Sequence, residues 1–304
     1  MSDNASVRWT VRTTLEWTQG HLEAKGVENP RLSAQWLLAD ATGLSRLELY
    51  TNYDLPLVPA QLATLREGIK RRIAGEPLQY ILGKAPFRHL ELRVRPGVLI
   101  PRPETEVLVD CVMEEVRAVA LSRSREVRVL DLCTGTGCIA LSLLQECSDV
   151  YVTATDIDPA AVELAQENAR ELGLDTGERL TMLEDDLATS LLADEAYHAT
   201  FDVLVANPPY VLTAELDNLP VEIANYEPRQ ALDGGSDGLA VFRRIAEEMT
   251  PLIRPGGLLA CELHEATLED AARICQDQGY GDIAIRLDLT GRPRFITARP
   301  PVLC

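Results

Sequence analysis

The sequence predicts an α/β protein in which a mostly parallel sheet with helices on both faces follows a small helical bundle. Residues 5–75 have helical periodicity without strand-like alternation. From residue 127 onward, short β-forming runs alternate with helical runs, which is typical of a parallel sheet. The last two β-forming runs are joined by residues 289–293 only, which predicts an antiparallel hairpin at one edge of the sheet.

The pattern predicts seven strands in this sheet and a helix after most of them. The strands are expected at residues 127–132, 150–155, 179–183, 201–206, 257–263, 282–288 and 294–298. The helices are expected at residues 106–120, 137–147, 159–172, 239–253 and 268–278. Ligands of such sheets bind beyond the carboxyl ends of the strands, near the point where the strand order reverses.

The N-terminal part reads as a bundle of short helices. Leu62, Leu65, Ile69 and Ile73 repeat every three to four residues, and Pro59 suits the first position of that helix. Because no catalytic group of residues is recognisable there, packing or the binding of a macromolecular partner is the expected role.

A β-hairpin is expected between the bundle and the sheet. Residues 87–100 alternate between apolar and polar side chains, and Arg95-Pro96-Gly97 supplies a turn. The chain is therefore expected to divide into a helical bundle at residues 1–84, a β-hairpin linker at 85–105 and the sheet domain at 106–304.

The composition is that of a globular protein in a reducing compartment. The chain has 304 residues, enough for two domains, with 46% hydrophobic and 25% charged residues. No signal peptide and no run of about eighteen apolar residues is recognisable. Seven cysteines form no CxxC pair and four histidines are dispersed, so we expect free thiols, no metal site, no membrane attachment and a cytoplasmic location.

The net charge of −18 is concentrated in the larger, C-terminal part of the chain. Residues 1–84 contain ten Lys+Arg and nine Asp+Glu, whereas residues 85–304 contain 19 and 38. An acidic surface repels phosphate backbones, which bind mainly through Lys and Arg. The charge therefore weighs against a nucleic-acid substrate.

A strand-like run at residues 201–206 ends in Asn207-Pro208-Pro209-Tyr210. Both prolines lack a backbone N–H, so this turn offers carbonyl acceptors without competing donors. Asn207 adds a side-chain carbonyl, and Tyr210 adds a flat face. Such a turn can hold an amide or amino group by its two hydrogens, although an ordinary exit from a strand is the alternative, since Asn-Pro and Pro-Pro are common in turns.

The ends of the three preceding strands have the residue types of a nucleoside-binding site. Asp131-Leu132-Cys133-Thr134-Gly135-Thr136-Gly137 lies where the first strand turns into its helix, and its small residues let the backbone approach a ligand. Asp156 ends the second strand, where a carboxylate can bind both hydroxyls of a ribose. Asp158 is as well suited to cap the next helix as to bind a ligand. Glu184-Asp185-Asp186-Leu187 closes the third strand, where an adenine edge would lie.

With these motifs the chain resembles the class I S-adenosylmethionine-dependent methyltransferases, and among them the HemK/PrmC family of release factor glutamine methyltransferases. The resemblance covers nearly the whole chain and includes residues 76–83, 99–106, 226–228 and 231–239. Two departures stand out. Cys133 replaces the first glycine of the usual loop, and Glu262-Leu263-His264 replaces a usual Glu-x-Gly. The resemblance implies a Rossmann-like class I methyltransferase domain after the bundle and the linker.

The resemblance also implies the activity. The expected reaction transfers a methyl group from S-adenosyl-L-methionine to the side-chain amide nitrogen, N5, of the glutamine in the Gly-Gly-Gln motif of class I peptide chain release factors. S-adenosyl-L-homocysteine is the other product. The N-terminal bundle is expected to help dock the release factor.

The site residues implied by the resemblance fall into two groups. The substrate amide is expected to bind Asn207, Pro208, Pro209 and Tyr210, with Asn207, Pro208 and Tyr210 in catalytic roles. The cofactor is expected to bind Cys133, Thr134, Gly135, Thr136, Gly137, Asp156, Asp186, Leu187 and Asn207, with Asp131 ordering the loop.

Two other functions use the same residues. An N6-adenine DNA or RNA methyltransferase shares the Asn-Pro-Pro-Tyr motif, but it needs a basic groove, which the acidic residues 85–304 argue against. A non-catalytic scaffold that binds S-adenosylmethionine would keep the fold, but the intact residues 207–210 and Asp156 disfavour it.

Overall fold

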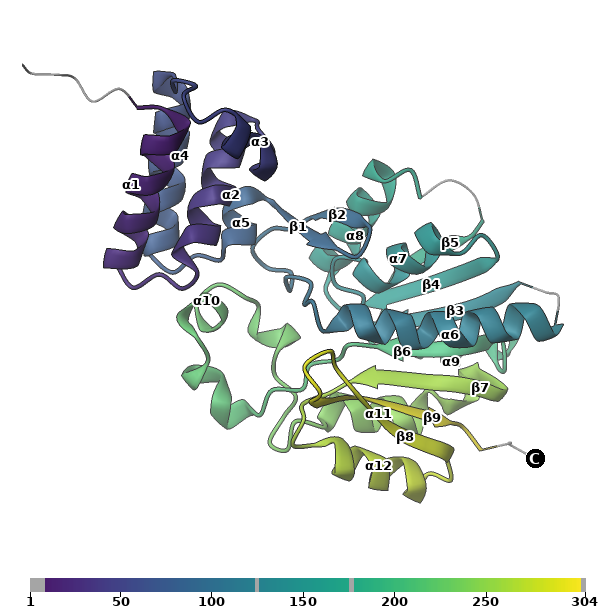
Figure 1. Cartoon of the computed structure of the whole chain (residues 1–304). Helices are drawn as coiled ribbons and strands as arrows, with labels where there is room; N and C mark the ends of the chain where they lie inside the picture. Colours follow the sequence, from purple (N-terminus) through teal and green to yellow (C-terminus); the bar gives the residue numbers. More distant parts are fainter. Residues whose placement is uncertain (1–8, 124–125, 175–177, 302–304) are drawn as a thin grey trace, which may run out of the picture. The chain divides into compact units, whose positions relative to one another are not determined.

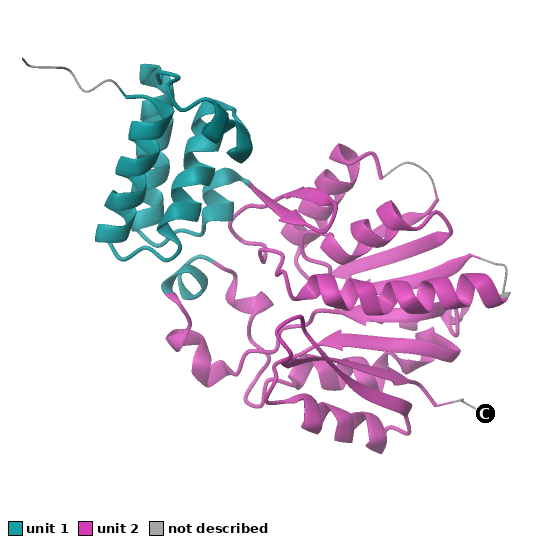
Figure 2. Ribbon diagram, viewed as in Figure 1, with its two compact units in different colours: residues 1–83, 221–226 teal, residues 84–220, 227–304 magenta. Residues whose placement is uncertain are grey.

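The computed structural model describes residues 9–123, 126–174 and 178–301 (Figure 1). The chain forms two compact units (Figure 2). Unit 1 combines Met1–Gly83 with Val221–Tyr226, and unit 2 combines Lys84–Pro220 with Glu227–Cys304. In the described part of the chain, no helix combines the length and the apolar character that a bilayer crossing requires.

Unit 1 is a bundle of short helices, as the sequence predicts. Its helices are α1 (Val11–Ala24), α2 (Pro30–Thr42), α3 (Arg46–Thr51), α4 (Pro59–Ile73) and α5 (Leu78–Leu82). Pro59 occupies the first turn of α4, and the apolar face of that helix buries Leu65 and Ile69. Unit 1 therefore has a hydrophobic core of its own, formed mainly by α1, α2 and α4.

A segment from far along the sequence completes unit 1. The chain enters it at Val221, forms α10 (Val221–Ala224) and leaves it after Tyr226. The guanidinium of Arg72, whose side chain is 6% exposed, forms an ion pair of 2.7 Å with Glu222. The Tyr226 hydroxyl donates to the Ala74 carbonyl at 3.1 Å. These contacts fix the segment to the C-terminal end of α4.

Unit 2 begins with the expected hairpin, but the predicted position of its turn is wrong. β1 (Lys84–Phe87) and β2 (Leu90–Arg93) pair antiparallel, so the hairpin turns at residues 88–89 and not at 95–97. Arg88 has a φ of 51° there, in the region that favours glycine. Its guanidinium reaches both carboxylate oxygens of Glu146, at 2.6 and 2.9 Å. The turn is held by this long-range ion pair, which no local sequence signal reveals.

The large sheet of unit 2 has seven strands in the order β5-β4-β3-β6-β7-β9-β8. The strands are β3 (Val127–Leu132), β4 (Val150–Asp156), β5 (Leu180–Glu184), β6 (Phe201–Ala206), β7 (Ile253–Glu262), β8 (Gly281–Leu287) and β9 (Pro293–Arg299). The first five pair in parallel, and β9 lies antiparallel between β7 and β8. The predicted sheet and its terminal antiparallel hairpin are confirmed.

Helices cover both faces of this sheet (Figure 1). On one face, α6 (Thr105–Arg123) and α7 (Cys138–Glu146) bury apolar side chains against alternate residues of the central strands, and α8 (Pro159–Glu171) also packs on this side. On the other face, α9 (Thr189–Leu192), α11 (Ala240–Glu248) and α12 (Leu268–Asp277) pack against the remaining alternate residues. Burial of the central strands β3 and β6 on both faces explains why most of their residues are apolar.

The strand order reverses between β3 and β6. The chain proceeds from β3 outward to β4 and β5, and then returns to β6 on the other side of β3. Leu132 of β3 pairs with Ala206 of β6, so the loop that begins at Cys133 and the turn that begins at Asn207 leave the sheet side by side. A ligand crevice is expected at this switch point.

Candidate active site

A cavity in unit 2 lies at the carboxyl ends of β3, β4 and β6. It brings together seven of the residues expected at the site: Cys133, Thr134, Gly135, Thr136, Asp156, Asn207 and Pro209. Five other expected residues do not line it: Gly137, Asp186, Leu187, Pro208 and Tyr210. The remaining wall comes from residues 97–105, 138–139, 157–161 and 228–231.

The loop after β3 is shaped by positive backbone angles. Cys133, Gly135 and Gly137 have φ values of 58°, 56° and 81°. A Cβ atom on Gly137 would lie 3.1 Å from the Leu141 side chain and 3.2 Å from Ala165, so only glycine fits without displacement. Cys133 adopts a left-handed conformation that favours glycine, so a cysteine at this position adds backbone strain.

Asp131 orders this loop from beneath. It is fully buried, and its Oδ2 accepts from the Thr134 hydroxyl at 2.7 Å and from the Ala140 N–H at 3.2 Å. Its Oδ1 is buried without a hydrogen-bond partner among the described residues. Burial raises the pKa of Asp131 to about 7.

Asp156 joins the loop to the end of β4. Its Oδ2 accepts from the Gly135 N–H at 2.8 Å, and its Oδ1 accepts from the Asp158 N–H at 3.0 Å. Burial raises the pKa of Asp156. Asp158 accepts from the Ala160 N–H at 2.9 Å and so caps α8, although it also lines the cavity. Each oxygen of Asp156 keeps a lone pair with which it can accept a hydrogen bond from a hydroxyl group.

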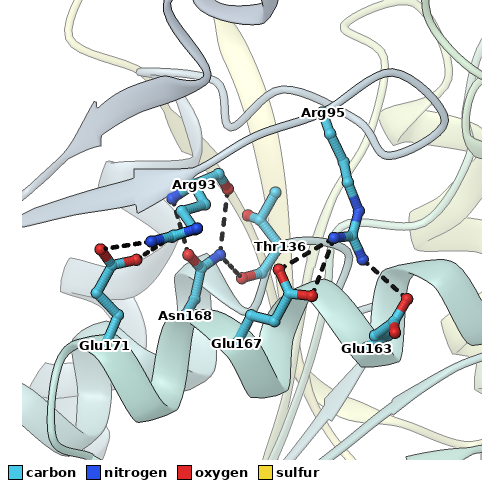
Figure 3. Close-up of polar contacts among 7 residues, drawn as sticks. All are labelled: Arg93, Arg95, Thr136, Glu163, Glu167, Asn168 and Glu171. Carbon is cyan, nitrogen blue, oxygen red and sulfur yellow. Dashed lines mark hydrogen bonds and ion pairs between the residues drawn. The ribbon is translucent and has the colours of Figure 1, made fainter.

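Asn168 on α8 ties the same loop to the hairpin, and sequence reasoning missed it (Figure 3). Its Oδ1 accepts from the Arg93 N–H at 2.7 Å. Its Nδ2 donates to the Arg93 carbonyl at 3.2 Å and to the Thr136 carbonyl at 3.0 Å. The side chain is 1% exposed, so all three bonds are made away from water. An asparagine in the middle of an otherwise amphipathic helix was the only sequence signal for this role.

Asp186 and Leu187, which follow β5, are bonded to α11 and β4. Asp186 forms an ion pair with Arg244 of α11, with distances of 2.9 and 3.2 Å. The Leu187 carbonyl accepts a hydrogen bond from the Thr155 hydroxyl of β4. Their assignment to the adenine end of a cofactor stays a prediction.

The Asn-Pro-Pro-Tyr turn rests on a buried network that sequence reasoning also missed. The Asn207 Nδ2 donates to the Thr105 Oγ1 at 3.1 Å, and the Thr105 Oγ1 donates to the Glu262 Oε2 at 2.7 Å. The Tyr210 hydroxyl donates to the other oxygen, Oε1, of Glu262 at 3.2 Å. Glu262 ends β7 directly beyond the Ala206–Cys261 pair, so the strand register places it beside Asn207.

The glycines of residues 233–238 pack against the back of this turn. Gly234 donates to the Val211 carbonyl at 2.8 Å, and a Cβ atom on Gly234 would lie 2.7 Å from the Tyr210 Cα. At Gly238 the φ is 73°, and a Cβ atom would lie 2.7 Å from the Tyr210 carbonyl oxygen. Glycine at positions 234 and 238 therefore allows the two segments to approach this closely.

Two loops at the rim of the cavity are joined by an ion pair. One Nη of Arg102 donates to both carboxylate oxygens of Glu227, at 2.8 and 2.7 Å. The Glu227 side chain is 2% exposed. Arg102 and the adjoining Pro228 both line the cavity, so this pair fixes part of its wall.

The departure at residues 262–264 also has a structural role. The Ala266 N–H donates to the His264 Nδ1 at 3.3 Å, and the His264 carbonyl accepts from the Thr267 N–H at 3.0 Å. His264 therefore closes the turn that leads into α12. Within the described residues, no cluster of His, Cys, Asp and Glu has the composition of a metal site.

The family model "PrmC N-terminal domain" matches residues 13–83, and "Methyltransferase small domain" matches residues 104–236. A release factor glutamine methyltransferase of Geobacter sulfurreducens is 41% identical over 96% of this chain and 97% of its own length. The chain belongs to this family. Release factor glutamine methyltransferases of Moorella thermoacetica and Mycolicibacterium smegmatis are 41% and 39% identical, over 95% of this chain and 98% and 97% of theirs.

Solved structures support the fold that the release factor glutamine methyltransferase family implies. A SAM-dependent methyltransferase from Agrobacterium tumefaciens superposes with a TM-score of 0.50 at 17% identity, over 72% of this chain and 71% of that one. The N-terminal domain of human METTL16 superposes with a TM-score of 0.53 at 18% identity, over 76% and 82%. The Rossmann-like class I methyltransferase fold is confirmed, and fold and family together support the use of S-adenosylmethionine.

Proposed function

We propose that this protein methylates the side-chain amide nitrogen, N5, of the glutamine in the Gly-Gly-Gln motif of class I peptide chain release factors. The observation that carries the proposal is the cavity at the switch point, where Asn207 and Pro209 face the same space as the loop at Cys133–Thr136 and Asp156. Relatives that are named for this reaction are similar to the chain over almost its full length.

The Asn-Pro-Pro-Tyr turn binds the substrate amide. The amide side of Asn207 already donates to Thr105, so its carbonyl oxygen is the side left to accept a hydrogen from the substrate. The Pro208 carbonyl accepts the second hydrogen, Tyr210 packs against the amide plane and Pro209 stiffens the turn. An amide nitrogen is a poor nucleophile, because its lone pair is delocalised, and so orientation in line with the methyl group is the main catalytic contribution.

The loop after β3 and the ends of β4 and β5 bind the cofactor. Residues 133–137 surround the methionine end, Asp156 accepts the ribose hydroxyls, and Asp186 with Leu187 borders the adenine. Asn207 lies between the two ligands and contacts both, and its contact with the cofactor adds little to cofactor affinity. S-adenosyl-L-methionine supplies a methyl group activated by its sulfonium, S-adenosyl-L-homocysteine remains, and no metal takes part.

The parts of the chain divide this work. The bundle at residues 1–84 docks the release factor, residues 85–105 link it to the catalytic domain, and residues 106–304 bind the cofactor and the glutamine. Because release factors act in translation, the reaction takes place in the cytoplasm. It involves neither a membrane nor a nucleic-acid substrate. The excess of Asp and Glu in residues 85–304 agrees with a protein substrate.

Peptide mass mapping tests the proposal. A class I release factor is incubated with the purified protein and labelled S-adenosyl-L-methionine, and duplex DNA is incubated in parallel. The expected result is one added methyl group on the glutamine of the Gly-Gly-Gln peptide and no label in DNA. Label in the DNA, or tight cofactor binding without methylation of the release factor, would contradict the proposal.

A further inference from the structure

Two buried side chains, Thr105 and Glu262, form the hydrogen-bond network beneath the Asn-Pro-Pro-Tyr turn. Thr105 begins α6, Glu262 ends β7, and both are 1% exposed. Burial of an ionisable carboxyl costs free energy unless hydrogen bonds satisfy it. Each oxygen of Glu262 accepts such a bond, one from Thr105 and one from Tyr210.

The direction of these bonds determines how the Asn207 amide is turned. A hydroxyl has only one proton to donate. Because the Thr105 proton goes to the Glu262 Oε2, the Thr105 oxygen can only accept from Asn207. The group of Asn207 that faces Thr105 must then be the NH₂, and the carbonyl oxygen must face the other way. A hydrogen-bond argument of this kind distinguishes the two ends of an amide.

This direction is fixed when Glu262 is ionised. Burial raises the pKa of Glu262 to about 7. The ionised carboxylate can only accept, so Thr105 must donate to it. In neutral Glu262, a proton on Oε1 is donated to the Tyr210 oxygen and leaves Oε2 as the acceptor for Thr105, whereas a proton on Oε2 would reverse the bond to Thr105.

We propose that Thr105 and Glu262 are positioning residues that set the orientation of the Asn207 carboxamide, so that its oxygen and not its nitrogen is presented to the substrate amide. The proposal rests on the proposed function, because it assigns the purpose of the orientation to the binding of a glutamine amide. A flipped Asn207 would present a donor to the substrate NH₂ group, which also donates, and the contact would become repulsive.

Paired substitutions at Thr105 test the proposal in the full-length protein. Thr105→Val keeps the shape of the side chain and removes the hydroxyl, whereas Thr105→Ser keeps the hydroxyl. We expect Thr105→Val to lower kcat for release factor methylation by about tenfold or more, the scale of a misoriented reacting group, and Thr105→Ser to stay within about threefold of the parent. The dissociation constant for S-adenosyl-L-homocysteine, measured by calorimetry, should change less than about twofold in both variants.

A double-substitution cycle shows whether Thr105 acts through Asn207. If it does, Thr105→Val should lower kcat in the parent but add no further loss to Asn207→Ala. Glu262→Gln provides a second test, because its amide can accept from Thr105 and donate to Tyr210, and it should keep more activity than Glu262→Leu. A crystal structure of Thr105→Val gives a readout independent of activity, and the Asn207 side chain is expected to be rotated or disordered in it.

The outcomes separate this proposal from the proposed function. Absence of methylation by the unmodified protein counts against the function itself. Methylation by the parent together with an unchanged kcat for Thr105→Val overturns the positioning role, and so does an equal loss in Thr105→Ser and Thr105→Val. The role is also refuted if Thr105→Val reduces the activity of Asn207→Ala by the same factor as that of the parent.

Discussion

Removal of the buried Asn168 side chain should destabilise the protein much more than removal of an exposed side chain on the same helix. Asn168 makes three hydrogen bonds at 2.7, 3.2 and 3.0 Å, two to the backbone of Arg93 and one to the Thr136 carbonyl (Figure 3). With about 1 kcal/mol for each buried hydrogen bond, Asn168→Ala should lower the free energy of unfolding of unit 2 by about 3 kcal/mol. In urea, this loss corresponds to a midpoint lower by about 1–1.5 M for a slope of about 2–3 kcal/mol/M.

Glu171→Ala is the matched control on the same helix. Glu171 pairs with the Arg93 side chain, but the two side chains are 51% and 60% exposed. Exposed ion pairs are screened by solvent and contribute little to stability, so this variant should unfold close to the parent. Asn168→Asp should be at least as destabilised as Asn168→Ala, because a carboxylate then faces the Arg93 and Thr136 carbonyls.

Cofactor affinity supplies the second readout for Asn168. The Thr136 carbonyl belongs to the loop at Cys133–Gly137, so loss of the tether should weaken binding of S-adenosyl-L-homocysteine in calorimetry, whereas Glu171→Ala should not. Equal urea midpoints for Asn168→Ala and Glu171→Ala would refute the assignment of Asn168 as a tether. A destabilised Asn168→Ala with unchanged affinity would refute only its effect on the loop.

Three further changes test the site. Asn207→Ala should lower turnover by at least ~100-fold, the scale of one preorganised polar group, with little change in cofactor affinity, and near-parental methylation of a release factor would contradict its role. Asp156→Ala should weaken S-adenosyl-L-methionine binding by ~1–3 kcal/mol in calorimetry, because charged hydrogen bonds to the ligand are lost, and unchanged affinity would count against the ribose assignment. For Asp131 the folded pKa of about 7 exceeds the unfolded value near 3.8, so its contribution to stability is complete below about pH 4 and is lost as pH rises through about 7. Without ligand, the melting temperature of Asp131→Asn should therefore fall less than that of the parent between about pH 5 and about pH 8, and parallel falls would show that Asp131 does not titrate in this range.

Most of the sheet could be predicted because its strands are buried on both faces. The central strands β3 and β6 are buried almost throughout and consist mostly of apolar residues, and both have the predicted bounds. The expected pairing of the glycine loop with Asn207 follows from one topological rule, the reversal of strand order beside β3. It could therefore be predicted from the sequence that Cys133, Asp156 and Asn207 line one cavity.

The parts that could not be predicted depend on contacts between distant residues. The hairpin turns at Arg88, which has a positive φ and is held by Glu146, whereas local turn signals pointed to Pro96 and Gly97. Glu262 lies 157 positions from Thr105 in sequence, and only the register of β6 and β7 brings it to Asn207. Strand register and an ion pair between distant residues decide these contacts, and neither has a local sequence pattern.

The insertion of residues 221–226 into unit 1 limits how freely its N-terminal part can be exchanged between relatives. Arg72 and Ala74 on one side, and Glu222 and Tyr226 on the other, belong to segments about 150 positions apart that form one folded body. A chimera that takes residues 1–83 from another protein would receive only one of the two partners in each of these contacts. Transplanting the two segments together should preserve the fold of the hybrid better than exchanging the N-terminal segment alone.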